Sequence, residues 1–267
     1  MNHGKTITSV QNPLVKKIVQ LQEKSRERKK GGLFVVEGRR EIELAQKGGY
    51  EIAQLFFVED IIDVYIEKFT SLFPNVERIE ISKMVYEKIA YRQSTEGILA
   101  MVKTKLHTLE DILFTSENPL ILVAEAPEKP GNIGALLRTA DAAGLDAVLI
   151  ANPKTDLYNP NIVRSSVGCV FTTQVGTGST KEIIAFLKER NISIRCAALS
   201  ASKDYITSEL TGPLALVVGT EATGLSDEWL DNSDENLIIP MRGEIDSMNV
   251  SVSAAILIFE AVRQRGL

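Results

Sequence analysis

Short apolar segments alternate with amphipathic segments along most of the chain, and this pattern predicts an α/β protein. Residues 120–124 and 214–218 are apolar along their whole length, which is typical of strands that a parallel sheet buries on both faces. Residues 133–143 instead place apolar side chains at helical spacing. In the second half of the chain we expect strands at 120–124, 147–150, 172–175, 192–197, 214–218 and 237–239, and helices at 133–143, 162–168, 181–190, 227–230 and 250–265.

The first half of the chain predicts a smaller α/β domain that follows a basic helix. Leu14, Ile18 and Leu21 recur at helical spacing within residues 12–30, and Gly31-Gly32 ends the pattern. The expected strands here are 34–36, 52–58, 76–81 and 98–102, and the expected helices are 39–47, 61–69 and 83–90. Polar residues 105–118 have the composition of a linker.

The composition fits a globular protein of two domains. The 267 residues exceed one ordinary domain, and 44% hydrophobic with 24% charged residues is typical of folded chains. No apolar run reaches the roughly 18 residues of a membrane span. The first residues also lack the apolar core of a secretion signal, so we expect a cytoplasmic protein.

The charges are unevenly distributed. The first 40 residues hold ten Lys or Arg and three Glu, so the net charge of −5 divides into +7 there and −12 elsewhere. A basic face on an acidic body suits contact with a phosphate backbone, although a solvated helix face explains the same charges. The basic residues expected to contact nucleic acid are Lys24, Arg26, Arg28, Lys29, Lys30 and Arg39.

Cysteine and histidine give no sign of a metal or redox site. Cys169 and Cys196 stand far apart in apolar surroundings, as buried free thiols do. His3 and His107 are each isolated, so neither a histidine metal site nor a histidine acid–base pair is expected. We therefore expect no bound metal.

Three loops that follow apolar segments carry glycine together with polar residues. They are residues 130–134 (PGNIG), 218–224 (VGTEATG) and 239–251 (IPMRGEIDSMNVS). The carboxyl ends of parallel strands meet at one edge of a sheet, and ligands bind at that edge. The three loops therefore predict one composite site.

These loops match, in order and spacing, the three motifs of SpoU-type RNA 2′-O-methyltransferases of the SPOUT class, which the chain resembles over residues 119–267. A weaker resemblance continues through residues 34–38 (FVVEG) and 96–100 (EGILA). The resemblance implies a parallel-sheet methyltransferase domain tied in a deep trefoil knot, with a smaller N-terminal ribosomal-protein-like α/β domain. It also implies S-adenosyl-L-methionine as cofactor, RNA as substrate, and a homodimer formed through the C-terminal domain.

Pattern and resemblance together divide the chain into four parts. These are a basic N-terminal helix (1–30), an RNA substrate-binding domain (31–104), a linker (105–118) and a SPOUT methyltransferase domain (119–267). A ribosomal-protein-like domain suits a folded RNA that is read by shape and by 2′-hydroxyl contacts. Ribosomal RNA is therefore the first expected substrate and transfer RNA the second.

By resemblance, the cofactor-binding positions lie on the second and third loops. Glycine after a buried strand lets backbone groups approach a ligand without an intervening Cβ, although a tight turn has the same sequence. Ile239 and Met248 would supply apolar contacts, unless they only pack in the core. The expected cofactor-binding residues are Val218, Gly219, Thr220, Gly224, Ile239, Met241 and Met248.

The expected catalytic residues match the family's motif residues one by one: they are Asn132, Arg138, Glu221, Ser247 and Asn249. Six residues apart, Asn132 and Arg138 can face one cleft. A guanidinium stays protonated, so we expect Arg138 to clamp a phosphate or a developing alkoxide, with a surface salt bridge as the alternative. Glu221 is either the proton acceptor or structural. Ser247 and Asn249 can cap the last helix as well as act in the site.

A fourth segment, residues 159–168 (NPNIVRSSVG), resembles the family less sharply and would place Arg164 and Ser165 near the acceptor nucleotide. Arg242 and Glu244 stand where the family varies. One rival interpretation is a dinucleotide-dependent oxidoreductase, but its Gly-x-Gly-x-x-Gly fingerprint is absent. The other is a non-catalytic RNA-binding or ribosome-assembly protein, which a cofactor-binding assay separates from the enzyme.

Overall fold

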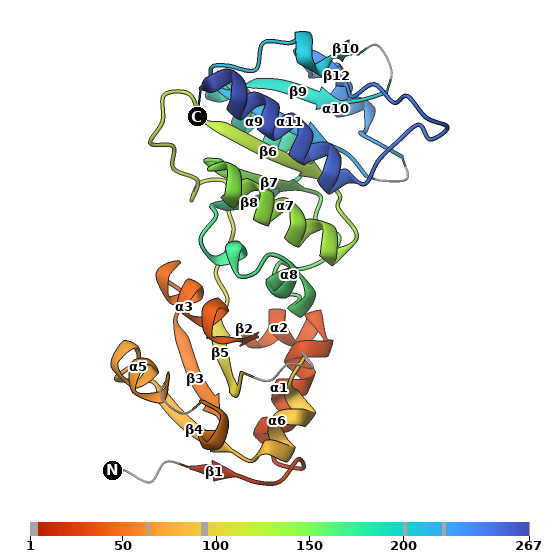
Figure 1. Ribbon diagram of the computed structural model, residues 1–267. Helices are drawn as coiled ribbons and strands as arrows, with labels where there is room; N and C mark the ends of the chain where they lie inside the picture. The colour runs from red at the N-terminus through yellow and green to blue at the C-terminus, as the bar shows by residue number, and fades with distance from the viewer. Residues whose placement is uncertain (1–4, 63–64, 92–95, 200–201, 221–222, 267) are drawn as a thin grey trace. The chain divides into compact units, whose positions relative to one another are not determined.

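The structure, a computed structural model, describes residues 5–62, 65–91, 96–199, 202–220 and 223–266. Its contacts group the chain into two compact units (Figure 1). The first unit spans Met1–Lys105 and Asp156–Thr172, and the second spans Leu106–Thr155 and Thr173–Leu267. Among the described residues, no helix has the length and apolar composition needed to cross a membrane.

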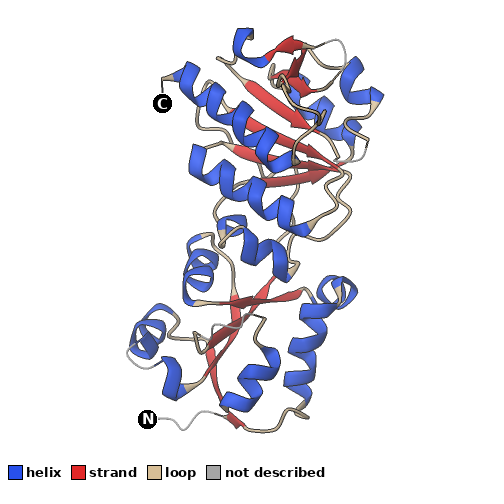
Figure 2. Cartoon of the chain, turned by 45° about the vertical axis from the view of Figure 1, so that its right-hand side comes forward, coloured by secondary structure: helices blue, strands red, loops and turns tan. Residues whose placement is uncertain are grey.

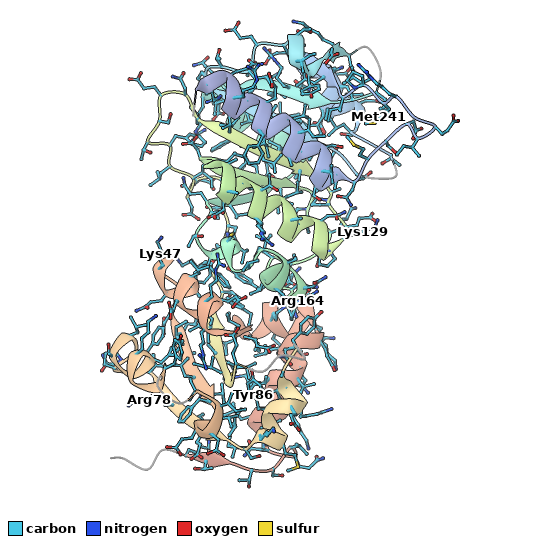
Figure 3. All side chains as sticks on the ribbon, in the orientation of Figure 1. Lys47, Arg78, Tyr86, Lys129, Arg164 and Met241 are labelled. Carbon is cyan, nitrogen blue, oxygen red and sulfur yellow. The ribbon has the colours of Figure 1, made fainter. Side chains whose placement is uncertain are left out.

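A mixed five-stranded sheet in the order β1-β4-β3-β5-β2 forms the centre of the first unit. Tyr86 of α6 is fully buried against it, in a cluster with Phe56, Ile79 and Leu99 (Figure 3). The strands are β1 (Thr6–Ile7), β2 (Leu33–Glu37), β3 (Ile52–Phe57), β4 (Glu77–Ile81) and β5 (Ile98–Lys103). The helices are α1 (Pro13–Glu23), α2 (Ser25–Gly31), α3 (Arg39–Lys47), α4 (Glu59–Ile62), α5 (Tyr65–Leu72), α6 (Lys83–Ile89), α8 (Pro160–Ser165) and the 3-10 helix η1 (Cys169–Phe171).

Two helices predicted in this unit differ from the structure. In place of one helix at 12–30, the structure has two helices, α1 and α2, because the backbone is extended at Lys24 between them. Asn12 does begin α1, and its side chain accepts a hydrogen bond from the Leu14 N–H. In place of one helix at 61–69, the described residues form α4 and α5. β1 was not predicted, because a strand of two residues carries no periodicity.

The second unit is built on a seven-stranded sheet, β10-β12-β9-β11-β6-β7-β8, in which every neighbouring pair is parallel. α7 and α11 lie side by side across one face (Figures 1 and 2). On the other face of the sheet, Ile121 and Val123 of β6 pack with Leu187 of α9 and Trp229 of α10. The strands are β6 (Leu120–Glu125), β7 (Ala147–Ala151), β8 (Val175–Gly178), β9 (Ser193–Ala197), β10 (Lys203–Asp204), β11 (Leu214–Val218) and β12 (Glu235–Ile238). The helices are α7 (Pro130–Ala143), α9 (Thr180–Glu189), α10 (Asp227–Asp231), α11 (Val250–Arg265) and the 3-10 helix η2 (Tyr205–Thr207).

The predicted α/β class with a parallel sheet is confirmed. One strand is displaced: we expected it at 172–175, and β8 begins only at Val175. The cause is the path of the chain, since residues up to Thr172 belong to the first unit. β10 was not predicted either, because it has only two residues.

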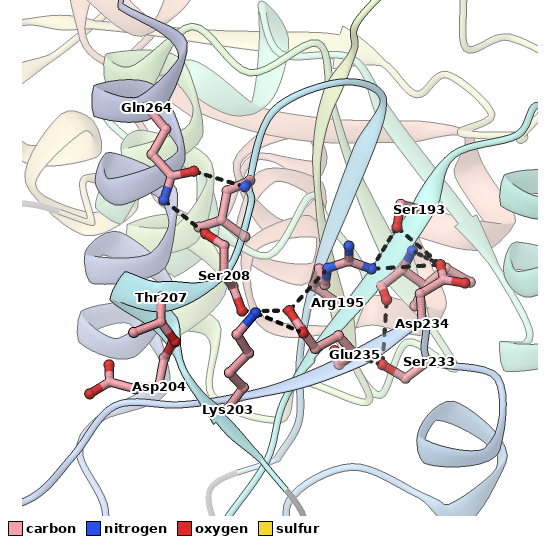
Figure 4. Close-up of polar contacts among 12 residues, drawn as sticks. Ser193, Arg195, Lys203, Asp204, Thr207, Ser208, Ser233, Asp234, Glu235 and Gln264 are labelled. Carbon is pink, nitrogen blue, oxygen red and sulfur yellow. Dashed lines mark hydrogen bonds and ion pairs between the residues drawn. The ribbon is translucent and has the colours of Figure 1, made fainter.

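Charged side chains hold the outer strands β9, β10 and β12 together (Figure 4). Arg195 of β9 and Lys203 of β10 lie 3.7 and 3.3 Å from the carboxylate of Glu235 on β12. Ser208 donates a hydrogen bond to the same carboxylate, and this bond, together with Lys203, holds the pKa of Glu235 below its usual value despite partial burial. Gln264 of α11 donates to the Ser208 carbonyl, so the network also ties this edge to the last helix.

Residues 156–172 pack in the first unit, although we expected 119–267 to form one domain. The Arg28 guanidinium donates two hydrogen bonds to the Asp156 carboxylate, at 2.9 and 2.6 Å. The Tyr158 ring stacks on Phe34 of β2, with ring centroids 4.2 Å apart. A buried ion pair and an aromatic stack therefore join this segment to the N-terminal helices and sheet.

Candidate functional site

A cavity of about 540 Å³ opens at the carboxyl ends of β9, β11 and β12. Its wall comes from the residues after β9, the turn after β11, and the loop between β12 and α11. All seven positions expected to bind the cofactor line it: Val218, Gly219, Thr220, Gly224, Ile239, Met241 and Met248. The volume lies within the roughly 300–1,000 Å³ of small-ligand pockets. The second and third motif loops thus meet at one cavity, as their position after parallel strands predicted, and the residues at the end of β9 complete its wall.

The turn after β11 is closed on itself, and Gly219 makes this closure possible. The Thr220 N–H donates to the Gly224 carbonyl at 3.0 Å, and the Gly224 N–H donates back to the Thr220 carbonyl at 3.1 Å. A Cβ at Gly219 would lie 2.2 Å from the Gly224 carbonyl carbon and 2.5 Å from the Leu225 nitrogen. Gly224 itself has a φ of 67°, in the left-handed region that favours glycine. The tight-turn interpretation therefore applies, and the turn shapes the cavity wall.

A second cavity, of about 420 Å³, adjoins the first. The two share Gly219, Thr220, Thr223 and Val250 in their walls. Asn132, in the first turn of α7, lines this smaller cavity. The first motif loop therefore reaches the same edge of the sheet as the second and third.

The structure brings Asn132 and Asn249 together from the first and third loops. The Asn249 Nδ2 donates to the Asn132 Oδ1 at 3.2 Å. The Asn249 Oδ1 accepts from the Ser251 N–H at 2.9 Å, which caps the first turn of α11. The capping role considered for Asn249 is confirmed, and its role in the site stays a prediction. Ser247 lines the larger cavity.

The shared cleft expected for Asn132 and Arg138 stays a prediction. α7 begins at Pro130, so both residues lie on the helix, and six residues rotate the side chain by about 240° beyond a full turn. Arg138 is exposed and is not among the described residues that line either cavity. Glu221, the fifth expected catalytic residue, lies outside the described residues.

The cations expected to contact RNA divide into exposed and buried groups. Those exposed on or next to α2 are Lys24, Arg26, Lys29 and Lys30. Arg28 requires a correction: its side chain is 3% exposed and binds Asp156, because the helix turns this one position inward. Arg39 is half-buried, with its guanidinium carbon 3.9 Å from the centroid of the Tyr65 ring.

Arg164 and Ser165 lie on α8 and belong to the first unit. Arg164 is exposed, and its guanidinium carbon lies 5.9 Å from the centroid of the Tyr91 ring. The Ser165 hydroxyl donates to the Asn161 carbonyl within the helix. Both cavities, in contrast, are lined by residues of the second unit.

Glu125, the last residue of β6, was not among the predicted site residues. Its buried carboxylate accepts hydrogen bonds from the Ser226 N–H at 2.8 Å, the Ser226 hydroxyl at 2.8 Å and the Thr180 hydroxyl at 3.1 Å. Ser226 follows the turn after β11, so Glu125 ties the end of that turn to the sheet. An acid at the end of an otherwise apolar strand was the available signal.

We expect Glu125→Leu to lower the free energy of unfolding by about 2–5 kcal/mol, because it leaves three donors without their acceptor. Glu125→Gln keeps one carbonyl oxygen for the Ser226 N–H, and the two hydroxyls can rotate toward other acceptors. The free energy of unfolding should therefore fall by less than half as much in Glu125→Gln as in Glu125→Leu. Urea unfolding of the two variants measures the difference. Equal losses would show that the one oxygen kept by Glu125→Gln does not replace the carboxylate as an acceptor.

The two cysteines are buried and free, as predicted. Burial raises the pKa of the Cys196 thiol to about 11, so it stays protonated and unreactive at neutral pH. Within the part of the chain that the structure describes, no group of three or more His, Cys, Asp or Glu could hold a metal ion.

The sequence matches two family models. Residues 119–259 match the SpoU rRNA Methylase family, and residues 12–100 match the MRM3-like substrate binding domain. The first match covers more than half of the chain and includes every residue that lines the two cavities.

Curated relatives and solved structures extend the similarity over both units. The chain is 30% identical over 255 residues to the 23S rRNA (guanosine(2553)-2′-O)-methyltransferase RlmP of Bacillus subtilis, covering 96% of this chain and 98% of the relative. It is 36% identical over 190 residues to the 23S rRNA (guanosine-2′-O-)-methyltransferase RlmB of Pectobacterium atrosepticum, covering 69% and 78%. An AdoMet-bound rRNA methyltransferase from Sinorhizobium meliloti has a similar structure, with a TM-score of 0.89 and 26% identity over 97% of each chain.

Proposed function

Because the chain belongs to the SpoU rRNA methylase family, we propose that it transfers a methyl group from S-adenosyl-L-methionine to a ribose 2′-hydroxyl of ribosomal RNA. One observation carries the proposal: the seven residues expected to bind the cofactor line a single cavity at the carboxyl edge of the sheet. The two relatives compared above are both named as 2′-O-methyltransferases of 23S rRNA.

The larger cavity fits S-adenosyl-L-methionine in size and in chemistry. Val218, Ile239 and Met248 offer apolar surface for an adenine ring, and the turn after β11 contributes backbone donors and acceptors. When bound, the cofactor supplies an activated methyl group. The protein binds it, holds the acceptor in line, and excludes water from the site.

The polar residues at the junction of the cavities are proposed to position the acceptor ribose. The hydrogen bond between Asn249 and Asn132, which lines the smaller cavity, holds the two side-chain amides together, and Ser247 lines the larger cavity. Glu221 is proposed as the acceptor of the 2′-hydroxyl proton. Arg138 keeps a proposed role as a phosphate clamp, acting from the exposed face of α7.

The first unit is proposed to bind the RNA. Its residues 12–100 match a substrate-binding domain, and the exposed cations of α2 offer contacts to phosphates. Arg164 and Ser165 on α8 are proposed to add contacts near the acceptor nucleotide. A ribosomal RNA substrate would place the protein in the cytoplasm.

We also propose a homodimer through α11 and a knotted C-terminal chain. Val252 and Phe259 are seven residues apart, share one face of α11, and are 47% and 48% exposed. Exposed apolar side chains in register on one helix favour burial against a partner. Membership of the SpoU rRNA methylase family supports the proposed knot.

We expect Phe259→Glu to convert the homodimer into a monomer, because an interface would have to bury an unpaired carboxylate. Sedimentation velocity at micromolar concentration measures the change. Leu113→Glu is the matched control, since Leu113 is 71% exposed outside α11 and should leave the dimer intact. A parent protein that sediments as a monomer would contradict the dimer.

Transfer of labelled methyl from S-adenosyl-L-methionine to unmodified ribosomal RNA, and separately to transfer RNA, tests the proposed function. A 2′-O-methyl group protects its linkage from alkaline hydrolysis, so label in one resistant dinucleotide establishes the reaction and maps the nucleotide. Label in transfer RNA alone would identify transfer RNA, and not ribosomal RNA, as the substrate. Failure to bind the cofactor would instead favour a non-catalytic RNA-binding protein.

A further inference from the structure

The smaller cavity holds two lysines that no motif predicted. Lys129 immediately precedes α7 (Figure 3) and Lys154 follows β7, and both line the cavity with Asn132. We propose that this cavity binds the phosphodiester next to the acceptor ribose, with Lys154 as the main anion contact and Lys129 as the second. The inference rests on the proposed function and identifies where the RNA backbone is held.

The position of the cavity favours an RNA phosphate as its ligand. It shares four wall residues with the larger cavity, where all the expected cofactor positions lie. An anion bound here is therefore a neighbour of the cofactor and not part of it. The 2′-hydroxyl and the 3′-phosphate occupy adjacent carbons of one ribose, so holding the phosphate also places the reacting oxygen.

The charges at the cavity suit an anion. Among the described residues that line it, the charged side chains are those of Glu128, Lys129 and Lys154, and Lys154 places a positive charge here on a chain whose net charge is −5. Lys154 is exposed, and no ion pair joins it to any residue that the structure describes. Lys68, Lys103 and Lys203, in contrast, are paired with carboxylates. The Lys154 ammonium is thus available to a phosphate.

The loops that carry the two lysines are fixed to the sheet. The Ala126 N–H donates to the Ala151 carbonyl at 2.7 Å, and the Asn152 N–H donates to the Gly178 carbonyl at 2.8 Å. Ala126 and Asn152 have φ values of 44° and 49°, a left-handed conformation that is disfavoured for residues with a Cβ. Such strain persists where the surrounding structure holds it, often at binding sites. The lysines therefore extend from well-defined backbone.

Lys154→Gln tests the inference because it removes the charge and keeps much of the side chain. The KM for in vitro-transcribed 23S rRNA is expected to rise about tenfold, while the affinity for S-adenosyl-L-methionine stays within about twofold. The slope of the logarithm of RNA affinity against the logarithm of salt concentration should decrease by the contribution of about one phosphate contact. Lys154→Arg is expected to restore most of the affinity, and Lys129→Gln to act in the same direction as Lys154→Gln.

Lys188→Gln is the matched control, because Lys188 is an exposed lysine of α9 that is not among the described residues lining either cavity. Its KM and salt slope should equal those of the parent. Filter binding of the same RNA supplies a readout that needs no turnover, so a parent that methylates no RNA contradicts only the proposed function. An unchanged RNA affinity and salt slope in Lys154→Gln would overturn the inference, as would an equal loss of cofactor affinity.

Discussion

Replacement of Gly219 by alanine is expected to weaken S-adenosyl-L-methionine binding by about 100-fold while both units stay folded. The added methyl group would lie 2.2 Å from the Gly224 carbonyl carbon and 2.3 Å from its oxygen. Both are backbone atoms, so no side chain can move aside, and the paired turn from Thr220 to Gly224 must open. Gly219, Thr220 and Thr223 belong to the wall that the two cavities share.

Isothermal titration calorimetry measures the cofactor affinity, and circular dichroism with thermal unfolding checks that the variant is folded. Gly243→Ala provides the matched control, because a Cβ at Gly243, in the loop between β12 and α11, meets nothing within 4 Å. Its affinity should remain close to that of the parent. An affinity of Gly219→Ala within a few-fold of the parent would mean that the turn can open without disturbing the cofactor.

The location of the site could be predicted from sequence, but the reason for its glycine could not. Apolar strands followed by glycine and polar residues indicated where ligands bind in a parallel sheet. For Gly219, the sequence left two explanations open, ligand approach and a tight turn. The contact between Gly219 and Gly224 depends on how the turn folds back, which the order of residues does not reveal.

The predicted start of the helix that carries Asn132 and Arg138 was wrong. We placed Asn132 in a loop and began the helix at Ile133, whereas α7 begins at Pro130. Proline favours the first helical position, so the signal was present in the sequence. A shift of three residues was enough to place the two side chains on different sides of one helix.

Contacts between distant residues account for the remaining differences. Glu125 binds Ser226, which lies 101 residues later, and Arg28 binds Asp156, which lies 128 residues later. A run of five cations predicts a basic surface, but it does not indicate which member turns inward to a partner. The path of residues 156–172 into the first unit likewise depends on tertiary packing.

Arg28→Met is expected to lower the free energy of unfolding of the first unit by about 3–5 kcal/mol, because it leaves the Asp156 carboxylate buried without its cation. Arg28 also donates to the carbonyls of Leu21 and Gln22, so the variant loosens α1 from α2 as well. Urea unfolding measures the loss. Lys103→Met is the control: its ion pair with Glu51 is exposed and should contribute at most about 1 kcal/mol.

The same ion pair predicts a difference in pH dependence. Burial alone would raise the pKa of Asp156, but hydrogen bonds from Arg28 and Ser25 hold it below its usual value. A carboxyl group with a lowered folded pKa stabilises the fold above its ordinary pKa, and this stability is lost as the pH falls through the folded value.

In Arg28→Met the guanidinium is gone and burial dominates, so the pKa of Asp156 rises and protonation relieves the unpaired charge. The stability deficit of the variant should therefore shrink as the pH falls from about 7 toward 3. Unfolding free energies measured at intervals across this range test the sign. A deficit that stays constant with pH would show that Arg28 stabilises the unit through its hydrogen bonds to the Leu21 and Gln22 carbonyls. The stack of the Tyr158 ring on Phe34 would then hold residues 156–172 in the unit without the ion pair.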